Sequence, residues 1–284
     1  MVEPIRPPRR FRRPSVIPGF GITFGYTLTC LCLVVLLPLA ALVAKASGIG
    51  LSGIVETARD PRVASALRLS FGVSLLAALT ASAFGFLVAW VLTRYRFPGR
   101  KLVDAVVDLP FALPTAVAGI ALASLYAPTG LLGGALERIG IQAAYTPVGI
   151  FIAMVFIGLP FTVRTVQPLI AEIDREVEEA SATLGATRRT TLARVILPPL
   201  IPAVLTGFAL AFARGVGEYG SIIFIAGNLP FVSEIAPLLI VIKLSEFDYG
   251  GAAAIATIML AISFLTLLAI NLIQAWSRRR FGYV

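Results

Sequence analysis

Residues 169–199 read LIAEIDREVEEASATLGATRRTTLARVILPP, and they form a charged segment between two strongly apolar parts of the chain. Asp174 stands where it would cap a helix, and three glutamates follow it in the first turns, where carboxylates favour the positive helix end. Gly185 stops this helix, because glycine readily adopts the left-handed conformation that ends helices. A second helix is expected over residues 187–195, ended by Leu197-Pro198-Pro199. The segment therefore predicts two short helices that face water.

The rest of the chain has the apolar composition of a membrane protein. Of its 284 residues, 58% are hydrophobic and only 14% are charged, whereas about a quarter are charged in soluble proteins. A helix needs about 20 apolar residues to cross the hydrocarbon core, and six windows meet this requirement. We therefore expect an all-α, polytopic membrane protein with about six transmembrane helices in one domain, residues 22–284, after a basic segment, residues 1–21. The expected spans are about 22–44, 67–93, 105–126, 147–166, 200–225 and 250–275.

The third expected span contains Pro110 and Pro114, so a kink or break is predicted there. Such breaks are tolerated in membranes where neighbouring helices or water satisfy the freed backbone groups.

The chain has a net charge of +9, and its basic residues are distributed along the sequence in a pattern that matches the expected topology. Basic residues gather before the first span and after the second, fourth and sixth, whereas the alternate loops contain few. This is the asymmetry of the positive-inside rule. It places both termini and the charged segment in the cytoplasm, and it argues against a nucleic-acid partner. The gathered residues are Arg6, Arg9, Arg10, Arg12, Arg13, Arg94, Arg96, Arg100, Lys101, Arg175, Arg188, Arg189, Arg194, Arg278, Arg279 and Arg280.

Several kinds of chemistry are excluded by composition. The chain has no histidine, the commonest metal ligand and general base, so neither a metal site nor a Ser-His pair is expected. Cys30 and Cys32, two residues apart in the first span, point to different helix faces and are expected to be packing residues. No G-x-x-x-x-G-K-[ST] phosphate loop occurs. We therefore expect no enzyme activity and no cofactor on this chain.

The charged segment resembles the EAA motif of bacterial ABC importer permeases: Glu179-Ala180-Ser181, Gly185 six residues after Glu179, and Val195-Ile196-Leu197-Pro198. Ser181 replaces the second alanine of the motif, and Val195 replaces isoleucine. The resemblance implies the type I permease fold. It also implies that this coupling loop, through Glu179, Ala180, Ser181, Gly185, Leu197 and Pro198, docks into a groove of a separate ATPase. The alternative is a merely solvated amphipathic loop.

Other segments resemble the permeases of sulfate and molybdate importers, most of all the T-type permeases of sulfate/thiosulfate importers: residues 92–100, 108–119, 163–168, 217–220, 224–228 and 246–249. The resemblance implies inward transport of sulfate, and also thiosulfate, across the bacterial inner membrane. It further implies a homologous second permease, an ATPase dimer that binds ATP-Mg, and a periplasmic or lipid-anchored binding protein. One alternative is a molybdate or tungstate permease. Another is an ion-coupled secondary transporter, which should show inverted repeats and a midplane substrate site.

Four ionisable residues are expected at membrane depth, where a charge costs at least ~2.5 kcal/mol at a helix centre: Asp108, Arg164, Arg214 and Glu218. Arg214 and Glu218 are expected on one face of the fifth span. Either Arg214 attracts the sulfate dianion while Glu218 keeps the site from trapping it, or the two form a structural pair, which we favour. Asp108 and Arg164 form an inner gate pair or simply lie near the interface.

Overall fold

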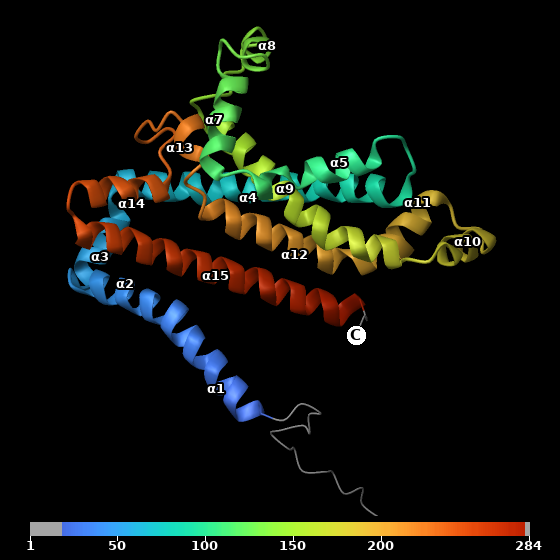
Figure 1. Ribbon diagram of the computed structural model, residues 1–284, viewed down its shortest axis with the longest axis horizontal. Coiled ribbons are helices and arrows are strands. Elements are labelled where there is room, and N and C mark those ends of the chain that lie inside the picture. Colours follow the sequence, from blue (N-terminus) through green and yellow to red (C-terminus); the bar gives the residue numbers. More distant parts are fainter. Residues whose placement is uncertain (1–18, 282–284) are drawn as a thin grey trace, which may run out of the picture. The chain divides into compact units, whose positions relative to one another are not determined.

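The computed structural model describes residues 19–281, which are helices and connecting segments without a strand (Figure 1). The chain divides into two units, residues 1–44 and 45–284. In the first unit, α1 (Phe20–Leu31) continues through a π-helical turn (Cys32–Leu36) into α2 (Leu37–Ser47). None of residues 20–44 is buried within the chain. Most of the basic segment predicted at residues 1–21 lies outside the described residues.

Within the described residues, five apolar helices are long enough to cross a membrane. These are residues 20–47, α4 (Pro61–Arg94), α9 (Pro147–Glu172), residues 188–216, and the apolar part of α15 (Tyr249–Phe281). They correspond to the first, second, fourth, fifth and sixth expected spans. The all-helical class predicted from the sequence is therefore confirmed.

The third expected span, residues 105–126, is divided between three short helices: α5 (Arg100–Val107), α6 (Leu109–Ala112) and α7 (Thr115–Tyr126). Pro110 lies in the first turn of α6, where its missing N–H has no consequence. Leu113 is extended, with φ −83° and ψ 135°, because the ring of Pro114 disfavours a helical residue before it. The predicted break is confirmed.

The fifth expected span, residues 200–225, differs in both boundaries. One long helix runs from α11 (Arg188–Thr191) through a π-helical turn (Leu192–Ile196) into α12 (Leu197–Val216), and a separate short helix follows, α13 (Ile222–Ile225). The prediction that Leu197-Pro198-Pro199 ends a helix is therefore wrong. In the π turn, the N–H of Leu197 bonds to the carbonyl of Leu192, and the wider turn accommodates the proline rings. The same turn precedes Pro38.

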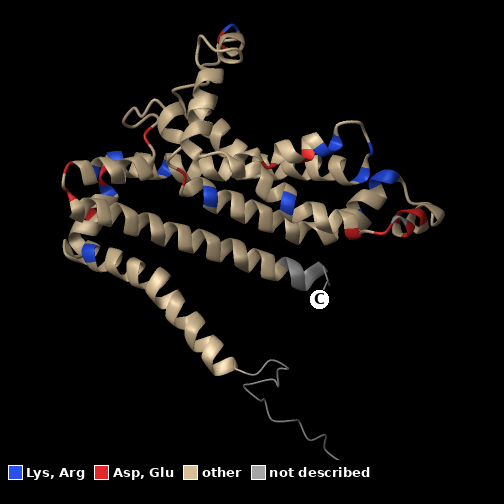
Figure 2. Cartoon of the chain, viewed as in Figure 1, with Lys and Arg blue, Asp and Glu red and all other residues tan. Residues whose placement is uncertain are grey.

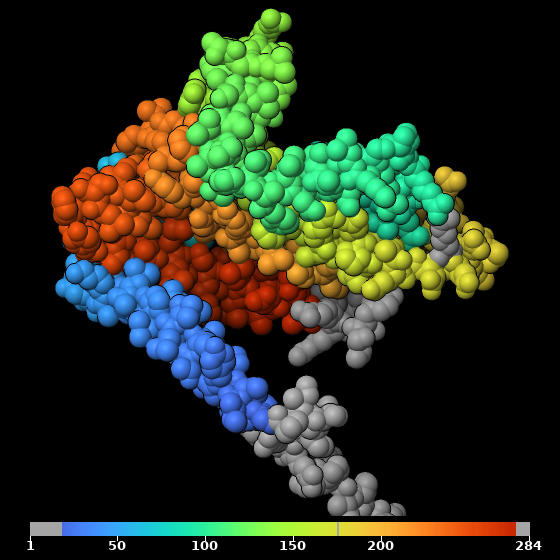
Figure 3. All heavy atoms as spheres, in the orientation of Figure 1, coloured from blue at the N-terminus to red at the C-terminus, as the bar shows by residue number. Residues whose placement is uncertain are grey.

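The centre of the second unit is formed by α4, α9 and α12, which pack closely through small residues. A Cβ atom added to Gly207 of α12 would lie 2.6 Å from Thr162 Cα in α9, and one added to Gly85 of α4 would lie 2.8 Å from Thr162 Cβ. Such close backbone approach is how helices associate in membranes, where dispersion contacts and not the hydrophobic effect hold them together. In Figure 3, α5–α7 cover one side of these helices and α15 covers the other.

Three further elements lie around the end of the second unit where α4 begins: α3 (Gly50–Arg59), α14 (Ala236–Ser245) and the start of α15. Arg62 of α4 donates two hydrogen bonds, of 2.8 and 2.7 Å, to buried Glu234. Asp248 caps α15 by accepting a hydrogen bond from the N–H of Gly251, at 2.8 Å. This bond, supported by nearby Lys243, holds the pKa of Asp248 below its ordinary value. The short α8 (Gly133–Glu137) follows α7.

Candidate functional site

The charged loop, residues 173–187, connects α9 to the long helix that begins at Arg188, and it contains α10 (Arg175–Thr183). Asp174 occupies the N-cap position, but its side chain makes no capping hydrogen bond. Gly185 has φ +81°, and the N–H of Ala186 donates to the carbonyl of Ser181 at 3.1 Å. The predicted glycine stop is thus confirmed. The hydroxyl of Thr187 accepts from the N–H of Thr190 at 3.3 Å, which confirms the start of the next helix.

Two side-chain contacts attach α10 to the helices of the bundle. The hydroxyls of Ser181 and Thr191 lie 2.8 Å apart, and both residues are buried. Glu178 forms an ion pair with Arg94, in the last turn of α4, with 3.1 Å between Oε1 and Nη2. The resemblance to the EAA motif placed Ser181 among the docking residues. In the structure its hydroxyl instead connects α10 to α11.

The other predicted coupling residues divide between the loop and the long helix. Glu179 and Ala180 are exposed on α10, and Gly185 is exposed at its end. Ala182 beside them is also exposed, so small side chains and a carboxylate share this surface. Leu197 and Pro198 lie instead at the start of α12, half-buried.

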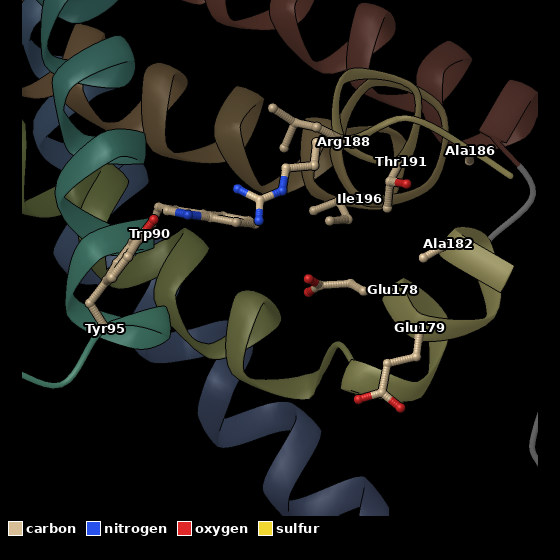
Figure 4. A pocket seen from close by; sticks show the side chains of 10 residues that line it. Trp90, Tyr95, Glu178, Glu179, Ala182, Ala186, Arg188, Thr191 and Ile196 are labelled. Atoms are coloured by element: carbon tan, nitrogen blue, oxygen red, sulfur yellow. The ribbon is translucent and has the colours of Figure 1, made fainter.

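A cavity of about 490 Å³ lies between the charged loop and the end of α4 (Figure 4). Trp90 and Tyr95 come from the end of α4, and Glu178 points into the space from α10. Its other lining residues are Glu179, Ala182, Ala186, Arg188, Thr191, Leu192 and Ile196. The loop therefore stands away from α4 over much of its length, and is held to it at a few points.

Arg164 lies at the centre of a polar network between α9 and α5. Its guanidinium donates to both carboxylate oxygens of Asp108, at 2.8 and 2.6 Å, and to the carboxylate and the carbonyl of Asp104, at 2.8 and 2.9 Å. A fifth hydrogen bond, of 2.7 Å, reaches Gln167. All five N–H donors are therefore satisfied. The predicted partners Asp108 and Arg164 are brought together, and Asp104 is a partner that the sequence analysis missed.

Arg214 and Glu218 form an ion pair, but not on one helix face as predicted. The helix ends at Val216, so Glu218 lies in the following turn. Glu218 is 2% exposed, and its Oε1 accepts hydrogen bonds from the N–H and the hydroxyl of Ser221, at 2.9 and 3.0 Å. The carboxylate is thus satisfied on several sides, as a buried charge requires. In the described part of the chain, no cluster of His, Cys, Asp and Glu side chains could hold a metal ion.

Charged residues are most frequent at the two ends of the second unit, and only a few lie on the helices between them (Figure 2). The arrangement is therefore that of an integral membrane protein with an exposed, charged helical loop at one end. The family described as "Binding-protein-dependent transport system inner membrane component" matches residues 81–283, so the chain belongs to this family of ABC transporter permeases.

Among the relatives of this chain are proteins named "Sulfate transport system permease protein CysT". The protein from Synechocystis sp. is 48% identical over 273 residues, which cover 96% of each chain. The protein from Escherichia coli is 47% identical and covers 94% of this chain and 97% of its own length. The chain is therefore similar over almost its whole length to proteins named as permeases of sulfate transport systems.

Solved structures support the same fold at low sequence identity. A chain of a bacterial alginate ABC transporter, in complex with a periplasmic protein, matches with a TM-score of 0.74 and 18% identity, covering 93% of this chain and 95% of its own. A chain of an amino acid ABC transporter matches with a TM-score of 0.52 and covers 78% of this chain. These likenesses establish the fold of an ABC importer permease.

Proposed function

We propose that this chain is the membrane-spanning permease subunit of an ATP-driven importer that moves sulfate, and also thiosulfate, into the cytoplasm. The observation that carries the proposal is α10 in the charged loop, an exposed helix attached to the ends of α4 and the long helix in a chain closely similar to sulfate permeases. An exposed helix with small residues and a carboxylate on its surface suits docking against another protein.

The partners follow from this role. An ATPase dimer, which binds ATP-Mg, docks on the charged loop through the exposed residues Glu179, Ala180 and Gly185, while buried Ser181 holds α10 against Thr191. A homologous second permease completes the pathway, and a periplasmic or lipid-anchored protein delivers the anion from outside. The complex resides in the bacterial inner membrane, with the charged loop in the cytoplasm. Neither a metal nor a cofactor is assigned to this chain.

Of the two ion pairs, we assign only the pair of Asp108 and Arg164 to the transport pathway. Asp108 and Arg164 connect α5 and α9 beside the break in the third span, so they suit a gate whose bonds must open and close. Arg214 and Glu218 are a structural pair, because Glu218 is already held by Ser221 and is buried.

The transported anion is tested by uptake of radiolabelled sulfate in a strain that lacks only this subunit. Reintroducing the chain should restore uptake, with competition by thiosulfate and little by molybdate. Restored molybdate uptake without sulfate uptake would sink the sulfate assignment and favour the molybdate permease.

The docking role is tested by Glu179→Arg. We expect sulfate uptake to fall by about tenfold or more while the permease still accumulates, because reversing a charge at an interface costs several kcal/mol. Glu176→Arg is the matched control, since Glu176 is also exposed on α10 but lies outside the EAA motif. Normal uptake and normally stimulated ATP hydrolysis with Glu179→Arg would contradict the docking role.

A further inference from the structure

Within the charged loop, Ile173 packs against the hydrophobic core that includes Ala89 and Leu92 of α4, but α10 itself lacks an extensive packed contact with the bundle. Among the side chains of α10 that the structure describes, only Ser181 is buried, and the cavity of about 490 Å³ separates α10 from the end of α4. Packed side chains therefore cannot transmit a displacement of α10 to α4 over most of this distance. Individual polar contacts must do so.

Arg94 supplies several of these contacts at once. Its Nη2 donates to the carbonyl of Ile173 at 3.2 Å and lies 3.1 Å from the carboxylate of Glu178. The guanidinium carbon lies 5.5 Å from the centre of the Trp90 ring, within the range of a cation–π contact. The Arg94 side chain is only 13% exposed, so solvent screens these contacts less than at a free surface.

The partners of Arg94 lie at mechanically distinct places. Ile173 is the first of two extended residues between α9 and α10, Glu178 is on α10 itself, and Trp90 is one turn earlier on α4. One planar side chain therefore connects the joint of the loop, the helix of the loop and the end of the central helix α4. A lysine would reproduce this set of contacts poorly, because its compact, strongly hydrated ammonium cannot stack on the Trp90 ring as a planar guanidinium does.

We propose that Arg94 is a positioning residue that transmits the movement of α10 to α4 when the ATPase acts. This inference rests on the proposed function. The contact between Ser181 and Thr191 transmits the same movement to the long helix 188–216, so the loop drives two helices of the bundle through two separate connections. The Arg94–Glu178 pair is close but not aligned as a hydrogen bond, which leaves room for it to tighten as α10 moves.

The test uses the complete importer in proteoliposomes, with its second permease, its ATPase and its binding protein, and measures sulfate transported per ATP hydrolysed. We expect Arg94→Gln to lower this ratio by about tenfold, the order expected for losing charge-assisted contacts. Arg94→Lys should restore little of it. A merely structural role would lower the amount of complex, or lower transport and hydrolysis together, without changing the ratio.

Arg96→Gln is the matched control, because Arg96 is exposed, lies two residues further on and forms no ion pair with any residue that the structure describes. It should keep the wild-type ratio. Glu178→Gln removes only the ion pair and should lower the ratio less than Arg94→Gln does. If Arg94→Gln assembles with a wild-type ratio, or fails to assemble while Glu178→Gln keeps that ratio, the inference is overturned. A wild-type complex that hydrolyses ATP without moving sulfate would instead overturn the proposed function.

Discussion

Gly185 determines how the charged loop turns from α10 to the long helix. Its φ of +81° lies in the left-handed region, and an added Cβ would meet no atom within 4 Å. The cost of a substitution there is therefore one of backbone conformation, about 1–2 kcal/mol for a residue other than glycine.

We expect Gly185→Val to loosen the loop and to raise the rate of limited proteolysis after Arg188 or Arg189 by about five- to thirtyfold, the factor that 1–2 kcal/mol represents. Gly185→Asn should stay near the wild-type rate, because asparagine tolerates the left-handed conformation. The rates are compared in inside-out vesicles. Equal rates for the two variants would mean that the backbone conformation of Gly185 does not hold the loop.

Single charged residues in the membrane were predictable as a group, because each is conspicuous in an apolar run. The sequence also suggested that Asp108 and Arg164 could form a pair, and the structure brings the two together. Asp104 was missed because it lies just before the expected third span, residues 105–126, although its position four residues before Asp108 places both carboxylates on one helix face. The ion pair of Arg94 with Glu178 was beyond prediction, since it depends on how the loop folds back, whereas the contact of Arg94 with Trp90 follows from their spacing of four residues on one helix.

At the scale of the elements, the positions of prolines led to one correct prediction, the break in the third span, and to one incorrect prediction, a helix end at residues 197–199. The break between α6 and α7 followed from Pro114, because a residue before proline avoids the helical region. Pro198 and Pro199 pointed equally to a helix end, yet the π turn keeps the helix continuous. A π turn has no reliable sequence pattern of its own, so the direct connection of the charged loop to α12 could not be derived.

The π turn inserts an additional residue into the helix, so its removal should rotate the residues before it by about 100° relative to α12. We expect the double variant Pro198→Ala/Pro199→Ala to move Thr191 away from Ser181. The contact is measured as disulfide formation between Ser181→Cys and Thr191→Cys, in a background with Cys30 and Cys32 replaced by alanine.

The disulfide should form readily with the native prolines and poorly in the double variant. Pro202→Ala, further along the same helix, is the control and should leave the yield unchanged. An undiminished yield in the double variant would show that the prolines do not maintain the π turn.

At the scale of the whole second unit, the charged loop and the α14–α15 connection lie at opposite ends (Figure 1). Ala180 is exposed at one end, and Phe247 is 76% exposed at the other. The distribution of arginine and lysine predicts that the end with Ala180 is cytoplasmic. The sequence therefore predicts a sidedness that helices alone do not determine.

We expect a membrane-impermeant maleimide to label Phe247→Cys from outside intact spheroplasts, and to label Ala180→Cys only in inside-out vesicles. Both variants are made without Cys30 and Cys32, and this cysteine-free chain is the control for background labelling. Labelling of Ala180→Cys from outside would reverse the topology and remove the basis for an ATPase at the charged loop.

The sparse attachment of α10 has a consequence for how such importers diversify. A segment joined to its scaffold by two side-chain contacts can accumulate substitutions on its outer surface without disturbing the tightly packed glycines between α4, α9 and α12. We expect that grafting residues 174–187 between homologous permeases, with Arg94 and Thr191 retained, changes which ATPase the permease binds. The packing of the membrane helices should stay intact.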